Sequence, residues 1–322
     1  MTATLPDPRV DEAEAAAVRK PGRRLRPRAT PASRPARTRT PAPRSSDTTA
    51  AVLSSAFTMI AIVSLWIAAQ LLVLGSISES RAQDLLYDEL RTELADGTAP
   101  IGPVVPVGDP VSLLTIPDIG LEQVVVEGTA SGDMLAGPGH RRDTPLPGQI
   151  GTSVVYGRAV TYGGPFGDLT RLQAGDKIEV VGAQGEKTFT VTGVRRAGDP
   201  LPQPPAEGAA RLILVTAEGS GRLGAITPES SVYVDADARK GFPAPPGRPV
   251  AVPDSERAMA QDSGALPLLA LCLALLLALT IGVIAACQRW STVLVWVIAS
   301  PLVIALSWVT TDVVMRLLPN LI

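Results

Sequence analysis

The chain alternates between long apolar runs and a region of short, interrupted apolar stretches. Residues 50–75 form an apolar run without a charged side chain, and residues 264–286 and 291–314 form two further runs. About 20 apolar residues are enough for a helix to cross the hydrocarbon core of a bilayer. The pattern therefore predicts three transmembrane helices, one before and two after the region of interrupted stretches.

Residues 112–237 have the pattern of short β-strands separated by turns. Seven stretches rich in apolar and β-branched residues alternate with clusters of Gly, Pro and Asp, at 112–116, 121–127, 152–156, 176–181, 187–194, 211–216 and 231–236. Seven short strands in succession favour a closed or nearly closed β-barrel. Residues 166–172 have the pattern of a helical turn, with Asp168 in position to cap it. We therefore expect an all-β fold accompanied by the three transmembrane helices.

Polar segments connect these parts of the chain. Residues 1–49 are rich in Pro, Ala and Arg and contain too few apolar residues to build a core, which predicts a disordered arm. Residues 76–111 begin with leucines at helical spacing and continue with many Pro and Gly residues, which predicts a helical stalk and an extended linker. The second part, residues 97–110, has an alternative interpretation as a lid over a binding groove. Residues 238–263 predict a further linker.

The charge distribution predicts how the chain is oriented in the membrane. Residues 1–49 contain eleven Lys/Arg and five Asp/Glu, whereas residues 76–263 contain sixteen and twenty-five. Positive residues favour the cytoplasmic side. We therefore expect the arm and Arg289, which lies between the last two apolar runs, in the cytoplasm, and the β-region outside the cell. This rule accounts for the basic arm better than nucleic-acid binding does, and anionic lipid is its expected partner, with a cytoplasmic protein as the alternative.

The sequence contains no pattern for a metal or cofactor site. Cys272 and Cys287 lie in or beside one apolar run, where a helix would separate them by about 22 Å, too far for a disulfide. The β-region has no Gly-rich phosphate loop, no His/Cys cluster with metal-ligand spacing and no nucleotide fingerprint. We therefore predict neither a metal nor a cofactor.

Four motifs in the β-region are similar to those of one enzyme family. They read TIPDIGLEQVVVEG at 115–128, GPGHRRDTPLPGQIGTSVVYG at 137–157, GPFGDLTRLQAGDKIEV at 164–180 and RLILVTAEGS at 211–220. In their order and spacing they resemble the sortases, the membrane-anchored cysteine transpeptidases of Gram-positive bacteria, and come close to the class C or E type. The resemblance implies an eight-stranded β-barrel outside the membrane, whose groove recognises C-terminal sorting peptides of secreted or cell-wall proteins.

The resemblance also places three residues where sortases have their catalytic groups. The family's Cys ends the strand that reads L-x-L-V-T-C, and Ala217 stands there after Thr216. The family's His follows the glycine of the S-V-x-x-G strand, and Arg158 follows Gly157 here. A methyl group is no nucleophile, and a guanidinium does not exchange protons near neutral pH. Both groups of the family's chemistry are therefore missing.

The third catalytic group of the family is an Arg that precedes the last strand. Ser231 matches its position, with Ser230 one residue away and Arg222 in the preceding loop as an alternative. On this alignment no catalytic residue is expected. The candidate groove consists of residues around the two strand ends: Gly157, Arg158, Thr216, Ala217, Glu218 and Ser231.

Two further charged or titratable residues enter the prediction. His140, the single histidine, lies in the GPGH motif, where the family has a histidine without a catalytic role, so we expect it to be structural. Glu218 follows Ala217, and we expect it to form an ion pair with Arg158.

Two functions from different classes fit the sequence. The first is a non-catalytic sortase-like protein that binds a sorting-type peptide, a secreted protein or a partner enzyme such as another sortase. The alternative is an active transpeptidase or hydrolase that uses other residues, and Ser220 with His140 would need a different active-site layout for this. A third possibility is a scaffold that acts through its membrane helices. An enzymatic activity is therefore left open by the sequence.

Overall fold

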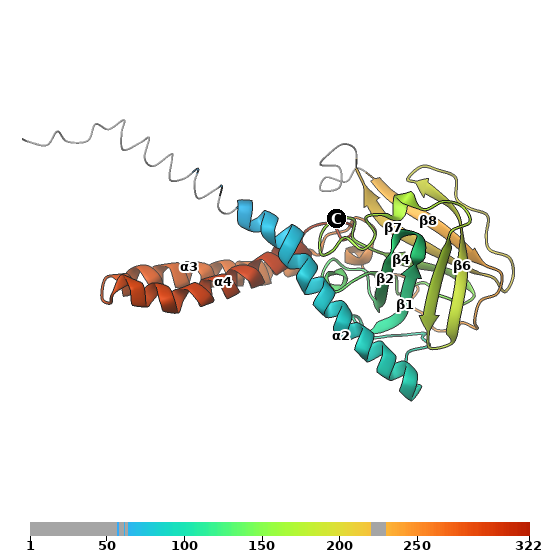
Figure 1. The fold of residues 1–322 in the computed structure, drawn as a ribbon, viewed down its shortest axis with the longest axis horizontal. Helices are drawn as coiled ribbons and strands as arrows, with labels where there is room; N and C mark the ends of the chain where they lie inside the picture. The colour runs from blue at the N-terminus through green and yellow to red at the C-terminus, as the bar shows by residue number, and fades with distance from the viewer. Residues whose placement is uncertain (1–56, 58–60, 62–63, 220–229) are drawn as a thin grey trace, which may run out of the picture. The chain divides into compact units, whose positions relative to one another are not determined.

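The computed structural model describes residues 57, 61, 64–219 and 230–322 (Figure 1). The predicted arm, residues 1–49, and the first half of the first predicted transmembrane helix, residues 50–75, lie largely outside the described residues. The described residues form a β-barrel, one long helix before it and a pair of helices after it.

Eight strands close into a barrel in the order β1-β2-β3-β4-β7-β8-β6-β5. They are β1 (Pro110–Ile116), β2 (Leu121–Glu127), β3 (Gly139–His140), β4 (Gly151–Tyr156), β5 (Lys177–Gly182), β6 (Gly185–Arg196), β7 (Ala210–Glu218) and β8 (Ser230–Ala238). The pairs β2–β3 and β4–β7 are parallel, and the other pairs are antiparallel. The closed barrel confirms the predicted all-β fold.

Two details of the barrel differ from the sequence prediction. The pattern does not predict β3, because a strand of two residues contains no alternation to detect. A short 3₁₀-helix, Leu169–Arg171, forms within the predicted helical turn, but the Asp168 side chain makes no capping hydrogen bond. Instead Asp168 Oδ2 lies 3.3 Å from Nη1 of Arg171. The predicted cap is therefore wrong, because an exposed arginine one turn later competes for the carboxylate.

Strand β7 is covered on both faces. It lies between β4 and β8, and successive side chains of a strand point to opposite faces. Leu212 and Leu214 belong to the main core inside the barrel. Val215 and Ala217 belong to a second apolar cluster, together with Met134, Tyr156 and Leu321. The outer face of β7 is thus covered by other parts of the chain, one of which is the C-terminal segment.

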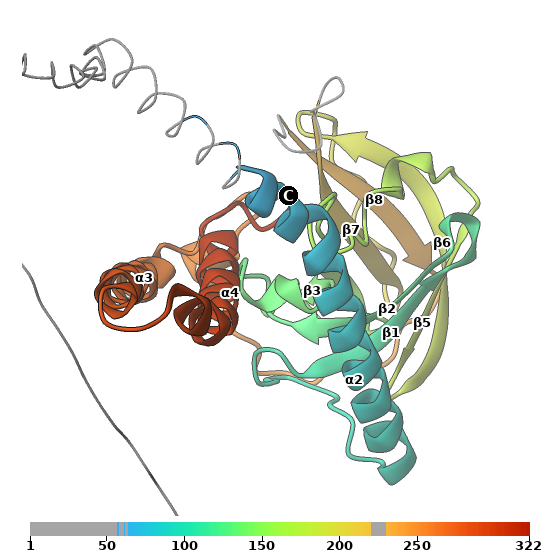
Figure 2. The same ribbon diagram turned by 60° about the vertical axis from the view of Figure 1, so that its left-hand side comes forward.

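The residues predicted as a helical stalk form α2 (Gly75–Asp96), which lies against β1 and β2 (Figure 2). Gln83 fixes it there: Nε2 donates to the backbone oxygens of Val124 at 3.1 Å and Ala136 at 2.7 Å. The Gln83 Oε1 atom accepts the Val124 N–H at 2.7 Å. Leu90 is buried, and the helix ends at Gly97 in the left-handed conformation, φ 70°, which glycine adopts without strain. The helix is therefore part of the folded domain.

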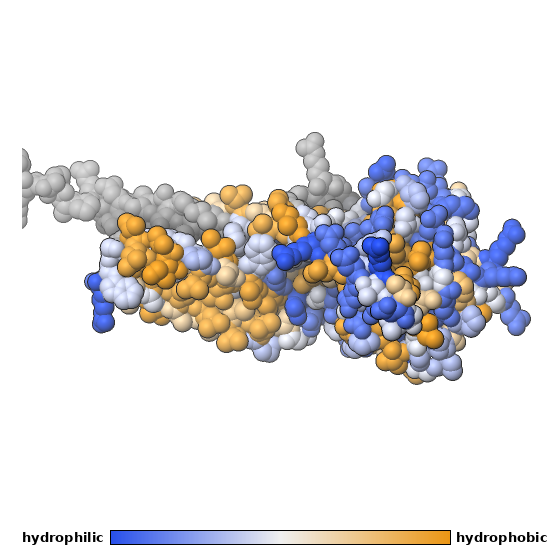
Figure 3. Space-filling view, turned by 60° about the horizontal axis from the view of Figure 1, so that its bottom comes forward, coloured by the Kyte–Doolittle hydropathy of each residue, from blue (hydrophilic) through white to orange (hydrophobic). Residues whose placement is uncertain are grey.

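Helices α3 (Leu266–Cys287) and α4 (Thr292–Arg316) pack side by side after the barrel. Both are long and apolar enough to cross a membrane, and they are the two such helices among the described residues, where the sequence predicts three in the whole chain. Figure 3 shows apolar surface gathered over this pair and polar surface over the barrel. Residues 288–291, which include Arg289, join the two helices.

Candidate functional site

The ends of β4, β7 and β8 bring the predicted site residues together. The register of β7 and β8 makes Ala217 the cross-strand partner of Ser231. The parallel pair β4–β7 places Tyr156 opposite Val215, and the Gly157 N–H donates to the Val215 oxygen at 2.9 Å. Arg158 therefore leaves the barrel beside the end of β7, next to the Ala217–Ser231 pair.

Four of the predicted groove residues are buried. The exposed fractions of Arg158, Thr216, Ala217 and Ser231 are 1%, 1%, 7% and 7%. Ala217 packs in the apolar cluster on the outer face of β7, and Thr216 points the other way by strand alternation. The Thr216 hydroxyl is buried without a hydrogen-bond partner among the described residues. In the part of the chain that the structure describes, these four positions are therefore covered by other residues, and the groove stays a prediction.

Arg158 is buried as a cation among oxygen atoms of the chain. Its Nη2 donates to the backbone oxygen of Ser131 at 2.7 Å and to the Ser131 hydroxyl at 2.9 Å. Its Nε donates to the Met134 oxygen at 3.3 Å, and its Nη1 donates to Thr161 Oγ1 at 3.0 Å and to the Ile322 oxygen at 3.2 Å. Five hydrogen bonds to oxygen atoms of the chain replace the water that a guanidinium loses on burial.

The charge of Arg158 is compensated by these dipoles and not by an acidic side chain. Among the described residues no Asp or Glu forms an ion pair with it, and its guanidinium lies 5.5 Å from the centre of the Tyr162 ring. Burial lowers the pKa of Arg158 to about 10. The side chain is therefore still protonated at neutral pH, and it cannot act there as a general acid or base.

The predicted ion pair between Glu218 and Arg158 is wrong. Glu218 pairs with Arg196 of β6, with Arg196 Nε 2.5 Å from Glu218 Oε2 and Nη2 2.9 Å from Oε1. This arginine holds the pKa of the Glu218 carboxyl below its usual value. Glu218 is the last residue of β7, and its side chain is partly exposed on the barrel surface. It therefore reaches a surface arginine across β8, whereas Arg158 is buried.

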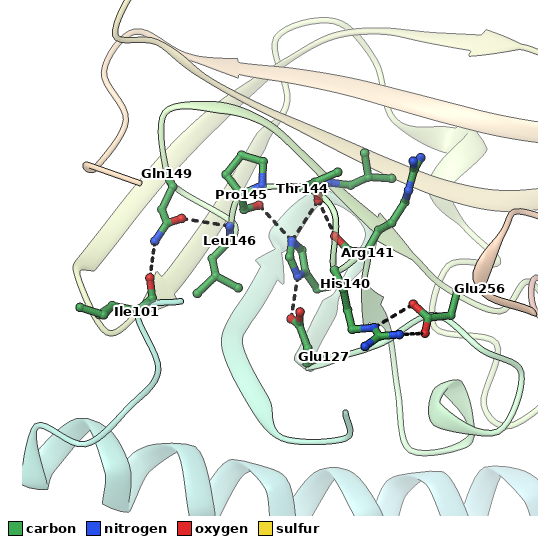
Figure 4. A network of polar contacts seen from close by, with 11 residues as sticks. Ile101, Glu127, His140, Arg141, Thr144, Pro145, Leu146, Gln149 and Glu256 are labelled. Atoms are coloured by element: carbon green, nitrogen blue, oxygen red, sulfur yellow. Dashed lines mark hydrogen bonds and ion pairs between the residues drawn. The ribbon is translucent and has the colours of Figure 1, made fainter. Parts of the chain in front are cut away.

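His140 is held in a buried network away from the strand ends (Figure 4). Its Nδ1 lies 2.7 Å from Glu127 Oε2, and its Nε2 lies 2.9 Å from the Pro145 oxygen and 3.1 Å from Thr144 Oγ1. The register places His140 opposite Val155 of β4, so that β4 separates it from β7. Both ring nitrogens are engaged by acceptors, which suits a structural histidine.

Several functional candidates fall outside or away from the site. Ser220 and Arg222 lie outside the described residues. The part of the chain that the structure describes contains no group of three His, Cys, Asp or Glu side chains arranged to hold a metal ion. The prediction of no metal or cofactor stays a prediction.

The sequence analysis missed the residues that surround Arg158. Ser131 and Thr161 lie in loops, and Ile322 lies after the last helix. Tyr162, next to Thr161, adopts a positive φ of 50° and donates from its hydroxyl to Asp312 Oδ1 at 2.7 Å. Burial, and then the Asp312 carboxylate, raise the Tyr162 pKa. Polar residues in a loop and a short, mostly apolar sequence after α4 give no signal of their own, because their partners are distant in sequence.

The family comparison identifies the barrel. Residues 114–223, which contain most of the barrel strands, match the family model described as "Sortase domain". Sortase D of Bacillus subtilis (strain 168) is 28% identical over 117 residues, which are 36% of this chain and 57% of that protein. The chain thus spans little more than half the length of that relative.

Solved structures of sortases are similar to the barrel. A Clostridium perfringens sortase D5 transpeptidase matches with a TM-score of 0.39 and 18% identity, over 50% of this chain and 98% of that one. Sortase E from Streptomyces avermitilis matches with a TM-score of 0.34 and 24% identity, over 48% and 100%.

Proposed function

We propose that this chain is a non-catalytic sortase-family protein of the Gram-positive cell envelope, which binds peptides without cleaving them. Its partners are then C-terminal sorting-type peptides of secreted or cell-wall proteins, or another sortase that processes such proteins. Its motifs place it near the class C or E type. The role of the chain would lie in the anchoring of cell-wall proteins.

The observation that supports this function is the chemistry of the three strand-end positions. Ala217 offers no nucleophilic atom, and Arg158 is a buried cation that exchanges no proton at neutral pH. Ser231, the cross-strand partner of Ala217, supplies no positive charge. The positions lie together as an active site requires, yet each lacks the group that transpeptidation needs.

The proposal includes a division of the chain into seven parts. These are the cytoplasmic arm, the first membrane helix, the stalk and linker, the barrel, the second linker and two more membrane helices, at 1–49, 50–75, 76–111, 112–237, 238–263, 264–286 and 291–314. The N-terminus then lies in the cytoplasm and the barrel outside the cell. The two apolar helices α3 and α4 support the membrane location.

An active transpeptidase or hydrolase with non-standard residues is the second candidate. A cavity of about 420 Å³ next to Tyr156 supports it, because Arg141, Asp143 and Arg257 bring charged groups into the space beside the strand ends. An aspartate can serve as nucleophile or base in such a space.

One experiment separates the two candidates. The full chain in lipid nanodiscs is mixed with fluorescent sorting-type peptides and with scrambled peptides of the same composition. Anisotropy measures binding, and mass spectrometry detects an acyl-enzyme or a cleaved peptide. Binding of the sorting-type peptide alone, without either product, supports the proposed function. Cleavage that Asp143→Asn abolishes supports the enzyme, and equal binding of both peptides contradicts the proposal.

A further inference from the structure

The C-terminal segment, residues 318–322, is built into the site around Arg158. Its last three residues are buried, with exposed fractions of 0% for Asn320, 0% for Leu321 and 7% for Ile322. The segment follows α4, and the chain end marked C in Figures 1 and 2 lies at the barrel. A short segment of mixed polarity after a membrane helix would normally be exposed. The burial of residues 320–322 therefore indicates specific contacts with the barrel.

The site holds the main chain of the segment. The Ala159 N–H donates to the Leu321 oxygen at 3.0 Å, and Arg158 Nη1 donates to the Ile322 oxygen at 3.2 Å. The Thr161 hydroxyl donates to the same Ile322 oxygen. Three donors from the loop after β4 thus converge on the main-chain oxygens of two successive residues, Leu321 and Ile322. This is how a protein recognises an extended peptide independently of its side chains.

The site also distinguishes side chains at two positions. Leu321 packs in the apolar cluster that contains Ala217 and Val215 of β7. Asn320 Nδ2 donates to the oxygens of Thr129 at 2.7 Å and Arg257 at 2.9 Å. The surroundings of Asn320 are polar, and those of the next residue, Leu321, are apolar. The site therefore favours an Asn-Leu sequence over sequences with a charged side chain at either position.

The methyl group of Ala217 is part of the leucine pocket. In the family pattern this is the position of the reactive thiol, and here it belongs to the same apolar cluster as Leu321. The segment therefore occupies space beside the position where chemistry would take place, and an external peptide would compete with it for that space.

We propose that the site around Arg158 is a receptor for a short peptide with an Asn-Leu core and no charged side chain, and that residues 318–322 of the same chain occupy it. This inference rests on the proposed function, since it names the peptide chemistry of the same site. An external peptide binds only after the segment leaves. The apparent affinity for this peptide is therefore the affinity of the open chain multiplied by the fraction of chains that are open. The receptor is thereby regulated by its own C-terminal residues.

The position of the segment is tested by thiol cross-linking in the full chain. Cys272 and Cys287 are changed to Ser, and Ala217→Cys is combined with Leu321→Cys. A short bifunctional thiol reagent should join the two residues within one chain. The matched control combines Ala217→Cys with Arg239→Cys, because Arg239 follows the far end of β8, eight residues beyond Ser231, or about 26 Å along the strand. A cross-link in the control alone, or in neither variant, overturns the inference.

The receptor is tested with the labelled peptide LPNLI, which has the sequence of residues 318–322. Leu321→Asp in the full chain puts a charge into the apolar pocket and should release the segment. If about 0.1–10% of the unchanged chains are open, a variant that is always open should bind the peptide about 10- to 1000-fold more tightly than the unchanged chain. Leu85→Asp is the control, because Leu85 is 64% exposed on α2. The peptide LPNDI should not bind to any variant.

The outcomes separate this inference from the proposed function. If Leu321→Asp binds LPNLI tightly but binds no sorting-type peptide from secreted proteins, the inference holds and the proposed partners are wrong. If Leu321→Asp, folded by circular dichroism, binds LPNLI no better than the unchanged chain, the inference is overturned. Sorting-type peptides that bind the unchanged chain and Leu321→Asp equally well leave the proposed function intact and overturn the inference.

Discussion

The guanidinium of Arg158 donates a hydrogen bond to the backbone oxygen of Ile322, 164 residues later in the sequence. One residue comes from the loop after β4, and the other lies beyond a helix long and apolar enough to cross a membrane. The contact therefore ties residues 318–322 to the strand ends of the barrel. Substitution of Arg158 should affect both the stability of the site and the access of a peptide to it.

Replacement of Arg158 by Gln should destabilise the full chain by about 2–4 kcal/mol, because five hydrogen bonds and a buried cation are lost and several acceptors remain without a partner. Denaturation in detergent, followed by circular dichroism, measures the change. Arg239→Gln is the matched control, since Arg239 is exposed. Equal midpoints for both variants would show that Arg158 contributes nothing to stability.

The strands that carry the motifs around Gly157 and Ala217 could be predicted from sequence, but the surroundings of Arg158 could not. Alternation and turn residues predict the two strands, and the resemblance to sortases implies that their ends are neighbours. The predicted ion pair between Glu218 and Arg158 depends on this adjacency alone. The side chains at the end of a strand can turn outward or inward, and only the packed structure shows that Glu218 turns to Arg196 while Arg158 turns into the protein.

The position of residues 318–322 at the site could not be predicted from sequence for a different reason. Residues 318–322 contain a pattern neither of a strand nor of a helix, and their partners lie between about 60 and 190 residues earlier. No local pattern can report such a contact. Asn320 becomes buried only when the loop after β2 and the segment around Arg257 are folded next to the end of α4.

Glu79 should make the chain less stable as the pH rises from about 4.5 to 7. Burial raises the pKa of this carboxyl from 4.5 to about 7, so the folded state binds more protons than the unfolded state within this window. The loss in the free energy of unfolding that comes from ionising the buried Glu79 carboxyl is absent below pH 4.5 and complete above pH 7, where it is on the order of 1–3 kcal/mol.

Glu79→Gln removes the titrating group and should flatten the stability curve between pH 4.5 and 7. Unfolding midpoints of the full chain at pH 5 and pH 7.5 provide the measurement, with Glu89→Gln as control, because Glu89 lies exposed on the same helix. If the stability of Glu79→Gln depends on pH as strongly as that of the unchanged chain, another group causes this dependence.

The proposed orientation predicts the pattern of protease digestion. A protease added to intact protoplasts should cleave the barrel linkers and spare an epitope tag placed before residue 49. Permeabilised protoplasts serve as the control, in which the tag should be digested as well. Loss of the tag from intact protoplasts would reverse the orientation.

Transpeptidation should be absent from the unchanged chain, and Ala217→Cys alone should restore little of it. Position 217 is buried in an apolar cluster with Leu321, and burial among apolar groups disfavours the reactive thiolate form of a cysteine. The leaving amine needs a proton that Arg158 does not give, a contribution of about 10²- to 10⁴-fold in rate. The positive charge for the developing oxyanion is also missing, which is worth on the order of 10²-fold.

The triple variant Ala217→Cys, Arg158→His and Ser231→Arg should therefore exceed the single variant by more than the product of the separate gains, because the three groups act as a unit. Leu321→Asp should increase its rate further by uncovering the thiol. The measurement is release of the leaving peptide from a sorting-motif substrate, with Ala217→Ser in place of Ala217→Cys as the control for thiol chemistry. Turnover by the unchanged chain that a substitution elsewhere abolishes would show that the domain is a working enzyme with other catalytic residues.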